Sequence, residues 1–438
     1  MSNPLQKVLG ARAQGRNAIL LFDTAATALA NVIVVIAASR ALTAGPLDSF
    51  SLAQLVLVML TQSVRTAIWS PALAAQRQTG KARIPLKWVA LLAPTVAAVA
   101  AFAMMALIPG NGSSAPIWWA TLALAGAALL AQDGLRSVLM SRDLTVGALV
   151  SDCCALAFIT LGAISGQLPE SASGILLFWA ASVGVAFAVG LVYLARRRDS
   201  VTLPPQSLSE TWRIGRWAAL DATFSSISTL LPFFVATLYV ANTSAGPYRI
   251  LQTAMGPLNI IYTTILTAFG LDAWQSATRA GLRALNQKAL RLSMILGGLV
   301  VLYVGVGIPA MIFLSGISHP ALLRISLIVA ANGIMGTAVA PIIAATLALG
   351  YQRFGAMIRF VVVVLAIAVS LPWSVNHVIP WRDPIGTSML ATGFVTMAGW
   401  AGAYIVAYYQ ELRRPARALV EEESAPTIRR WYQRSFAE

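Results

Sequence analysis

The chain has 438 residues, of which 58% are hydrophobic and only 11% are charged, and its mean hydropathy is +0.74. Because soluble domains carry about a quarter charged residues, this composition excludes an ordinary soluble protein and indicates a polytopic membrane protein. The formal net charge of +15 raises the alternative of a nucleic-acid partner, which the positions of the basic residues must decide.

Apolar runs of about 20 residues cross a bilayer as helices, and the sequence contains about twelve such runs. We therefore expect an all-α polytopic membrane protein rather than a β-barrel, which needs short alternating segments. The expected spans are residues 18–39, 50–71, 87–108, 116–138, 145–166, 173–195, 214–239, 247–271, 290–314, 321–349, 354–373 and 387–409.

The longest polar interruption before the C-terminal tail is Arg196–Arg213, which contains two prolines and several charges and is typical of an exposed connector. It separates two lobes of six helices, which we place at residues 1–200 and 201–412, followed by a tail at 413–438. The tripeptide Ala44-Gly45-Pro46 recurs as Ala245-Gly246-Pro247 at the corresponding point of the second lobe. The lobes are therefore interpreted as parallel repeats about an axis normal to the membrane.

Basic residues gather in the N-terminal segment, in the connectors after every second span and in the tail. A plasma-membrane (bacterial inner-membrane) protein with both termini in the cytoplasm accounts for nearly all 31 Lys and Arg residues by the positive-inside rule. This topology assigns Arg136 and Arg142 to a cytoplasmic loop and leaves Arg65 within the membrane. Because topology explains the charge, we expect no nucleic-acid partner.

No enzyme motif is present. His319 and His377 lie in separate outer connectors, and Cys153 and Cys154 are adjacent within one span, so neither a nucleophilic triad nor a metal signature is indicated. Glycine-rich nucleotide-binding patterns are also missing from the sequence. We expect a protein that is not an enzyme, with no catalytic residue, no metal and no cofactor.

Arg65 lies well inside an apolar span, where an arginine is costly and faces either a partner or a wet cavity. Asp23 lies at a similar depth in the first span. One interpretation is a neutralising ion pair between Arg65 and Asp23. The other is a cavity arginine for an anionic substrate, with the carboxylate modulating it; snorkelling of Arg65 to the inner interface is a third.

Polar side chains recur at helical spacing on the first, second, seventh and eighth spans, and we interpret these faces as the wall of one shared cavity. The alternative is that they are interhelical hydrogen-bonding residues at closely packed faces. Arg249 is equally consistent with an interfacial anchor and with a cavity role. Candidate substrate-binding residues are Asn31, Gln54, Gln62, Arg65, Arg249, Gln252 and Asn259, and candidates for ion coupling or ion pairing are Asp23, Asp152 and Asp221.

The connector Ser39–Phe50, SRALTAGPLDSF, is similar to the Ala-Arg-x-Phe-Gly-Ala-Gly…Asp-Ala-Phe connector of lipid II flippases. The run Phe50–Arg77 is similar to the second helix of O-antigen and capsule flippases, and Ala348–Arg353 to their polar turn into helix eleven. With its two six-helix lobes, the chain resembles the multidrug/oligosaccharidyl-lipid/polysaccharide (MOP) exporter superfamily.

The resemblance implies two lobes that form a V around a central cavity, which opens alternately to each side and receives a lipid-linked pyrophosphate on cationic residues. It assigns this role to Arg40, beside Asp48, by motif, and to Arg65 and Arg249 by helix number. Lipid II flippases have two further helices after the twelfth, so the resemblance favours the polysaccharide (O-antigen or capsule) branch.

We therefore expect a flippase or exporter that moves a polyprenyl-pyrophosphate-linked oligosaccharide from the inner to the outer leaflet. Its expected partners are this substrate, membrane lipids, a coupling proton or sodium ion, and envelope glycosyltransferases or a polymerase. Two alternatives stay open. A cation-coupled multidrug antiporter of the same fold predicts a net-negative, aromatic-lined cavity, which would exclude the flippase. A non-transporting scaffold for cell-envelope synthesis predicts polar faces packed together without a cavity.

Overall fold

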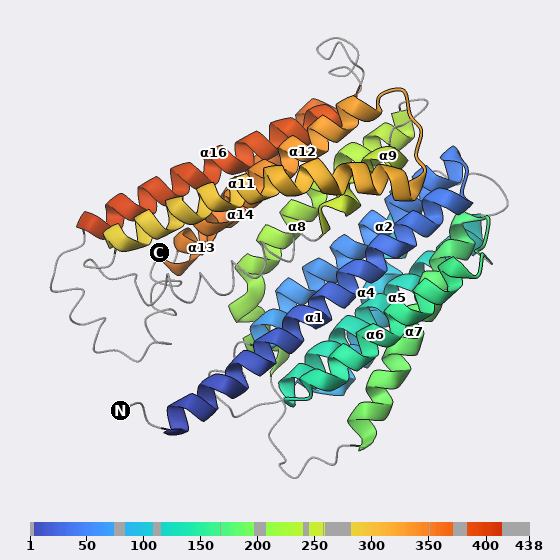
Figure 1. Cartoon of the computed structure of the whole chain (residues 1–438), viewed down its shortest axis with the longest axis horizontal. Coiled ribbons are helices and arrows are strands. Elements are labelled where there is room, and N and C mark those ends of the chain that lie inside the picture. Colours follow the sequence, from blue (N-terminus) through green and yellow to red (C-terminus); the bar gives the residue numbers. More distant parts are fainter. Residues whose placement is uncertain are drawn as a thin grey trace. The chain divides into compact units, whose positions relative to one another are not determined.

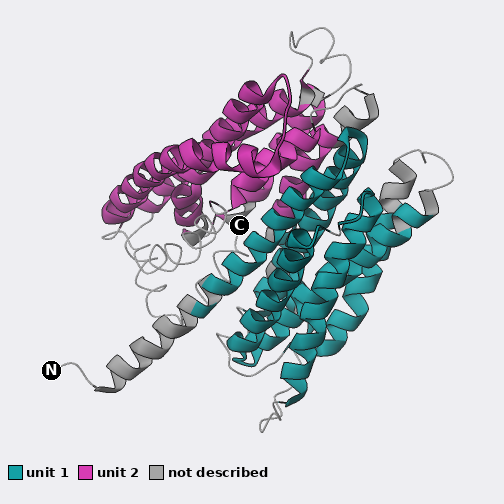
Figure 2. Cartoon of the chain, turned by 45° about the vertical axis from the view of Figure 1, so that its right-hand side comes forward, with its two compact units in different colours: residues 1–219 teal, residues 220–438 magenta. Residues whose placement is uncertain are grey.

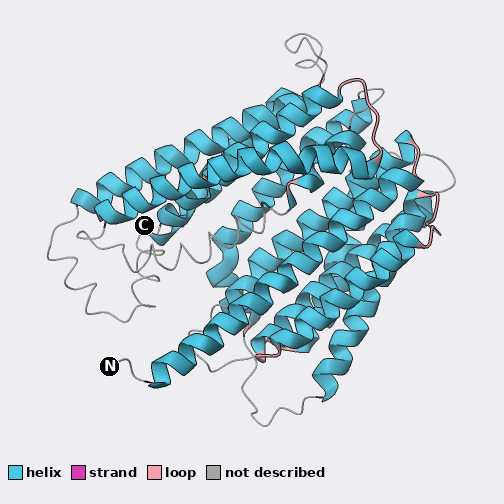
Figure 3. Cartoon of the chain, in the orientation of Figure 1, coloured by secondary structure: helices cyan, strands magenta, loops and turns pink. Residues whose placement is uncertain are grey.

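The computed structural model describes residues 4–73, 84–107, 115–166, 168–196, 207–239, 245–256, 258, 282–349, 351–370 and 383–413. Every regular element in these ranges is a helix (Figure 3). Eight helical stretches among them are long and apolar enough to cross a membrane, and Leu86–Phe102 and Phe354–Val369 are shorter apolar helices. The predicted all-α polytopic membrane fold is confirmed.

The helices of the first half run side by side in Figure 1. Their order along the chain matches the first six expected spans. They are α1 (Pro4–Ala41), α2 (Ala44–Val64) continued by the π-helical segment η1 (Arg65–Trp69), α4 (Leu86–Leu107), α5 (Ala115–Ser141), α6 (Thr145–Ile164) and α7 (Ala172–Arg196).

The second half follows the same order. If α2 and η1 count as one rod, and α12 and α13 as another, the described residues contain twelve helical rods, as predicted. The second-half helices are α8 (Leu208–Tyr239), α9 (Ala245–Ala254), α11 (Leu282–Ser315), α12 (Leu322–Ala338), α13 (Ala340–Ala348), α14 (Gln352–Ser370) and α16 (Pro384–Arg413).

The repeated tripeptide marks the first turn of equivalent helices. α2 begins at Ala44 and α9 begins at Ala245, so Pro46 and Pro247 both stand in a first turn. Proline is tolerated there because the first backbone N–H groups of a helix have no intrahelical acceptor. The tripeptide therefore forms the start of the second and of the eighth rod. It is not only part of the connector before each of them.

Several helices extend beyond their apolar runs. α8 begins at Leu208, inside the stretch expected to be an exposed connector, and the Thr211 amide donates to the Ser207 carbonyl at 3.1 Å. α11 likewise begins before the expected span, at Leu282. Hydropathy misses such turns because they are polar while their backbone hydrogen bonds are helical.

The chain divides into two compact units, residues 1–219 and 220–438 (Figure 2). The division falls within α8, beyond the connector at which the sequence placed it.

In unit 1, α5 packs against both α4 and α7. Gly134 permits the close approach to α4, since a Cβ there would lie 2.9 Å from a methyl group of Val89 and 3.0 Å from the ring of Trp69. Trp69 is 1% exposed and belongs to the apolar core that α4 and α5 share. Small residues at such contacts are what membrane helices use to pack closely. This packing sets the rotation of α5, and with it the direction of the neighbouring polar residues Gln132, Asp133 and Arg136.

In unit 2, α11, α13 and α16 share a second apolar core. It contains Leu282 and Leu285 of α11, Ala345 of α13, and Tyr404 of α16. α14 packs against α16, and α12 packs against α11 and α16. α16 therefore packs against α12, α13 and α14.

Candidate functional site

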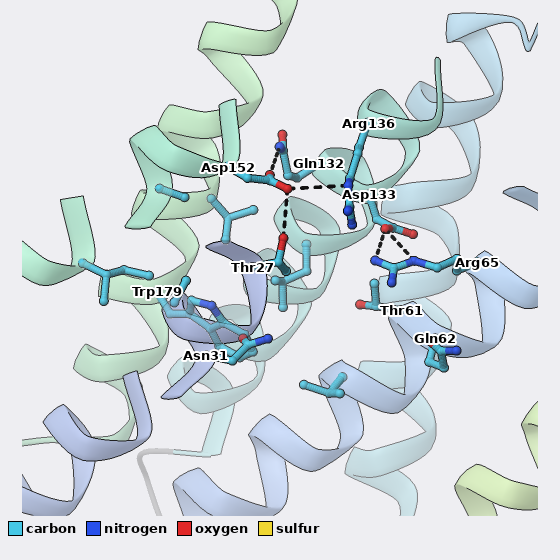
Figure 4. A pocket seen from close by; sticks show the side chains of 16 residues that line it. Thr27, Asn31, Thr61, Gln62, Arg65, Gln132, Asp133, Arg136, Asp152 and Trp179 are labelled. Carbon is cyan, nitrogen blue, oxygen red and sulfur yellow. Dashed lines mark hydrogen bonds and ion pairs between the residues drawn. The ribbon is translucent and has the colours of Figure 1, made fainter. Parts of the chain in front are cut away.

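A cavity of about 160 Å³ lies within unit 1 (Figure 4). Five rods surround it, and most of its polar lining comes from α1, α2 with η1, and α5. The lining residues are Thr27, Ala30, Asn31, Val58, Thr61, Gln62, Arg65, Leu129, Gln132, Asp133, Arg136, Asp152, Ala155, Ile159, Trp179 and Val183.

Arg136 of α5 joins two carboxylates from different helices. Its Nε donates to Oδ2 of Asp23 on α1 at 2.5 Å and lies 3.6 Å from Oδ2 of Asp152 on α6. Its Nη2 also pairs with Asp23. Asp23 is fully buried, Asp152 is 6% exposed and Arg136 is 8% exposed. Because a buried charge must be paired, this triad holds α1, α5 and α6 in register.

Neutral side chains complete the coordination of Asp152. The Thr27 hydroxyl donates to its Oδ2 at 2.9 Å, and the Gln132 amide donates to its Oδ1 at 2.9 Å. Gln132 also donates to Ser151 at 2.6 Å, and the Ser151 hydroxyl donates to the Ala186 carbonyl of α7 at 2.9 Å. The network therefore reaches from α1 to α7. It is a buried polar network of the kind that fixes one packing arrangement.

A second ion pair lies at the other side of the cavity. Both Nε, at 2.9 Å, and Nη2 of Arg65 donate to the same oxygen of Asp133, Oδ1. The side chain of Asp133 is 5% exposed, whereas that of Arg65 is 36% exposed. Figure 4 shows the guanidinium between Asp133 and the side chain of Thr61. The carboxylate is thus enclosed, and the cation forms part of the cavity surface.

The two sides of the cavity differ in formal charge. Arg65 and Asp133 balance one another, while Arg136 faces both Asp23 and Asp152. Among the lining residues Arg65 and Arg136 balance Asp133 and Asp152, so the cavity surface is not net negative. The one excess negative charge comes from Asp23, which lies behind the lining and pairs with Arg136. Among the described residues no group of three His, Cys, Asp or Glu side chains is arranged to hold a metal ion, and the cation between Asp23 and Asp152 is a guanidinium.

Of the interpretations open for Arg65, the ion pair with Asp23 is not found. Asp23 pairs with Arg136, and Arg65 pairs with Asp133. Arg136, assigned from the charge distribution to a cytoplasmic loop, lies inside α5 and is buried. The sequence contains the signal, because Gln132, Asp133 and Arg136 share one helical face in the last two turns of an apolar run. Counting Arg136 as a loop residue concealed that face.

The structure brings together the unit 1 candidates Asn31, Gln62, Arg65 and Asp152, which line the cavity, with Asp23 behind them. Gln54 is fully buried in α2 outside this lining. Arg40 is exposed at the end of α1. The polar face predicted on the second span therefore has two parts: Gln54 is packed inside the protein, and Thr61 faces the cavity.

The remaining candidates belong to unit 2. Asp221 of α8 lies 3.6 Å from Arg359 of α14, whose Nη1 donates to Thr396 of α16 at 3.4 Å. Arg249 and Gln252 lie on α9, and the Gln252 amide is 3.7 Å from the Met389 sulfur. Asn259 lies outside the described residues. A single cavity shared by the candidates of both units stays a prediction.

The sequence matches no protein-family model and no curated protein. Three solved structures resemble the chain over nearly its whole length. They are an inward-facing conformation of a multidrug resistance MATE family transporter of the MOP superfamily (TM-score 0.64, 14% identity, 91% of this chain and 96% of that chain), an outward-facing conformation of such a transporter (0.56, 13%, 93% and 97%), and the lipid II flippase MurJ in an inward closed conformation (0.55, 13%, 95% and 95%).

These structures are transporters and a flippase rather than enzymes. At identities of 13–14% the likeness concerns the fold, which is common to proteins named for different cargoes. The chain is therefore a multi-pass membrane protein with the fold of the MOP superfamily.

Proposed function

We propose that the chain is an alternating-access flippase that moves a polyprenyl-pyrophosphate-linked oligosaccharide from the inner to the outer leaflet of the plasma membrane. We infer a phosphate-bearing substrate from the partly exposed guanidinium of Arg65 on the cavity surface. A planar guanidinium suits phosphate oxygens. Asn31 and Gln62, which also line the cavity, offer amides for sugar hydroxyls.

We further propose that a proton is the coupling ion and that Asp23 and Asp152 share it. These carboxylates exceed by one charge the single guanidinium between them, so one proton would balance the triad. A sodium ion would have to displace Arg136 from the position between them. Proton binding then biases the two access states through its different affinity for each.

A multidrug antiporter of the same fold is the second candidate. The observation that favours it is the extra buried carboxylate together with Trp179, since an organic cation needs a negative, aromatic site. The two candidates differ in which residue the cargo contacts: Arg65 for a phosphate, Asp152 for an organic cation. Export of glycan and resistance to cationic compounds, measured on the same cells, separate them.

Arg65→Ala is expected to lower oligosaccharide export at least about thirtyfold, because a phosphate held by a guanidinium in a partly dehydrated site loses about 2 kcal/mol or more when that partner is removed. The measurement is surface glycan in cells whose own flippase has been deleted. Arg65→Lys keeps the charge and is expected to retain part of the export.

The matched control is the double variant Arg65→Ala/Asp133→Asn, which also removes the carboxylate that Arg65 neutralises. If Arg65 binds the substrate, the double variant exports as poorly as Arg65→Ala. Recovery of export in the double variant would show that Arg65 serves only to balance Asp133, and the phosphate role would be wrong.

Asp152→Asn is expected to remove the part of the pH-gradient dependence of transport that comes from the triad, because the triad with Arg136 is then neutral without a proton. Transport is measured in proteoliposomes with imposed proton or sodium gradients. Asp143→Asn, in the exposed turn between α5 and α6, is the matched acid-to-amide control and keeps the wild-type response. A wild-type protein that responds to sodium alone would contradict the proton.

A further inference from the structure

The ion pair between Arg65 and Asp133 has an unusual form for two groups of opposite charge. Guanidinium and carboxylate groups usually meet as two parallel hydrogen bonds, one to each oxygen. Here Arg65 directs both donors to Oδ1, and Oδ2 of Asp133 is buried without a hydrogen-bond partner. The guanidinium therefore has N–H donors that Asp133 does not use, and the carboxylate has one oxygen that accepts no hydrogen bond.

The two members of this pair also differ in access. Both side chains line the cavity, but that of Asp133 is nearly enclosed, whereas that of Arg65 is more exposed and has donors that Asp133 does not use. Arg65 opens the π-helical segment η1, where the Ser70 amide donates to the Arg65 carbonyl. Such wide turns occur frequently at functional sites and interrupt the regular hydrogen bonding of a helix. An anion that enters the cavity reaches Arg65 before it reaches any other part of the pair.

An anion bound to Arg65 competes with Asp133 for the same guanidinium. If the anion wins, Asp133 is left as a buried carboxylate without its cation, which is strongly unfavourable. The arrangement removes this cost if Asp133 takes up a proton as the anion binds. Protonation also leaves no unpaired negative charge on Oδ2, the buried oxygen that lacks a partner in the structure.

Among the described residues, Arg65 is the cation in contact with Asp133. Arg136, on the next turn of α5, also attracts Asp133 electrostatically, but it is held by Asp23 of α1 and Asp152 of α6. α7 contributes Trp179 and Val183 to the cavity, and α4 contributes apolar side chains to the core that it shares with α5. Arg65 is the guanidinium that contacts Asp133 in the described part of unit 1.

We propose that Asp133 is a proton-linked specificity residue, which releases Arg65 to an anionic headgroup only when it becomes protonated. Binding of one headgroup is then accompanied by uptake of one proton at Asp133, separate from the proton shared by Asp23 and Asp152. This inference rests on the proposed function, because it requires a phosphate-bearing cargo at Arg65. It adds a selection rule, since an anion that cannot displace the carboxylate does not bind.

The test is binding of a short-chain prenyl-diphosphate-linked monosaccharide to the purified full-length protein in nanodiscs. This probe is a diphosphate diester, so it lacks the ionisation near pH 6 that a phosphate monoester has, and its own charge stays constant between about pH 5 and pH 8. Titration calorimetry in buffers of different ionisation enthalpy gives the affinity and the number of protons taken up with the probe.

For the wild type we expect uptake of one proton and an affinity that falls about tenfold for each unit of rising pH, which is the slope for one linked proton. Asp133→Asn has no proton to take up, and its amide cannot neutralise Arg65. We expect it to bind the probe with no pH dependence and at least about tenfold more tightly at neutral pH. Asp143→Asn is expected to behave as the wild type.

The outcomes separate this inference from the proposed function. If neither the wild type nor any variant binds the probe, both are overturned. If the wild type binds, and Arg65→Ala loses binding, but no proton is taken up, then the proton linkage alone is overturned. The linkage is also overturned if Asp133→Asn takes up a proton as the wild type does. Thermal melting of each variant shows whether a loss of binding reflects a loss of folding.

Discussion

Arg136→Met is expected to destabilise the protein by about 3–5 kcal/mol, the cost of removing one partner from a buried ion pair. The substitution leaves Asp23 and Asp152 as neighbouring buried carboxylates with no cation between them, one of them fully buried. Methionine has a similar length, so it fills the space of the arginine without creating a large cavity. The measurement is the apparent melting temperature of the purified protein in a fixed detergent.

The matched control removes all three charges. Arg136→Met/Asp23→Asn/Asp152→Asn leaves no buried ion without a partner, and replacing a buried charge network by neutral residues is often close to neutral for stability. We expect the triple variant to recover most of the lost melting temperature and to lose the proton coupling that depends on Asp23 and Asp152. If Arg136→Met alone melts like the wild type, the triad does not hold α1, α5 and α6 together.

The helices could be predicted because each apolar run is long enough to cross a membrane, and the start of α2 could be matched to that of α9 through the repeated tripeptide. Helix ends outside the apolar runs could not, as α8 shows. Its first turn contains polar residues, and hydropathy reports solvent preference rather than backbone hydrogen bonding.

The candidate site could be predicted only in part. Asp23, Arg65 and Asp152 stood out because an ionised side chain in an apolar run has an obvious cost. Their partners depend on which helices are neighbours and how each is rotated, and the sequence does not specify either. Arg65 pairs with Asp133 because η1 lies next to α5, and Asp23 pairs with Arg136 because the long arginine side chain reaches from α5 to α1.

Unit 2 contains a buried carboxylate that the sequence interpretation left within an outer connector. Asp383 is 6% exposed and immediately precedes α16, which begins at Pro384. Its Oδ1 accepts the Gly386 amide at 2.9 Å, so Asp383 is the N-cap of that helix, with proline at the preferred first position. The pair Asp-Pro before an apolar run is a helix-start signal that the sequence does carry.

The other oxygen of Asp383 joins two more helices to α16. Oδ2 accepts the hydroxyl of Tyr248 of α9 at 2.7 Å and lies 3.4 Å from Nη2 of Arg324 of α12. Tyr248 is fully buried, and a Cβ added to Gly386 would lie 2.2 Å from its hydroxyl oxygen. The close approach requires glycine at position 386. Asp383 therefore connects α9, α12 and α16 at a tightly packed point.

Asp383→Ala is expected to destabilise unit 2 by about 3 kcal/mol, from about 1 kcal/mol for the lost N-cap and about 2 kcal/mol for the buried Tyr248 hydroxyl left without an acceptor. Asp383→Asn keeps an oxygen acceptor for the cap and loses the charge, so about 1 kcal/mol or less is expected. Melting of the two variants under identical conditions gives the comparison.

Tyr248→Phe separates the two contributions, because it removes the hydroxyl while leaving the N-cap intact. We expect Asp383→Ala/Tyr248→Phe to be less destabilised than the sum of the two single changes, since both remove the same hydrogen bond. Simple additivity in this cycle would mean that Asp383 and Tyr248 stabilise the protein independently of one another. The coupling between α9 and α16 through Tyr248 would then have to be abandoned.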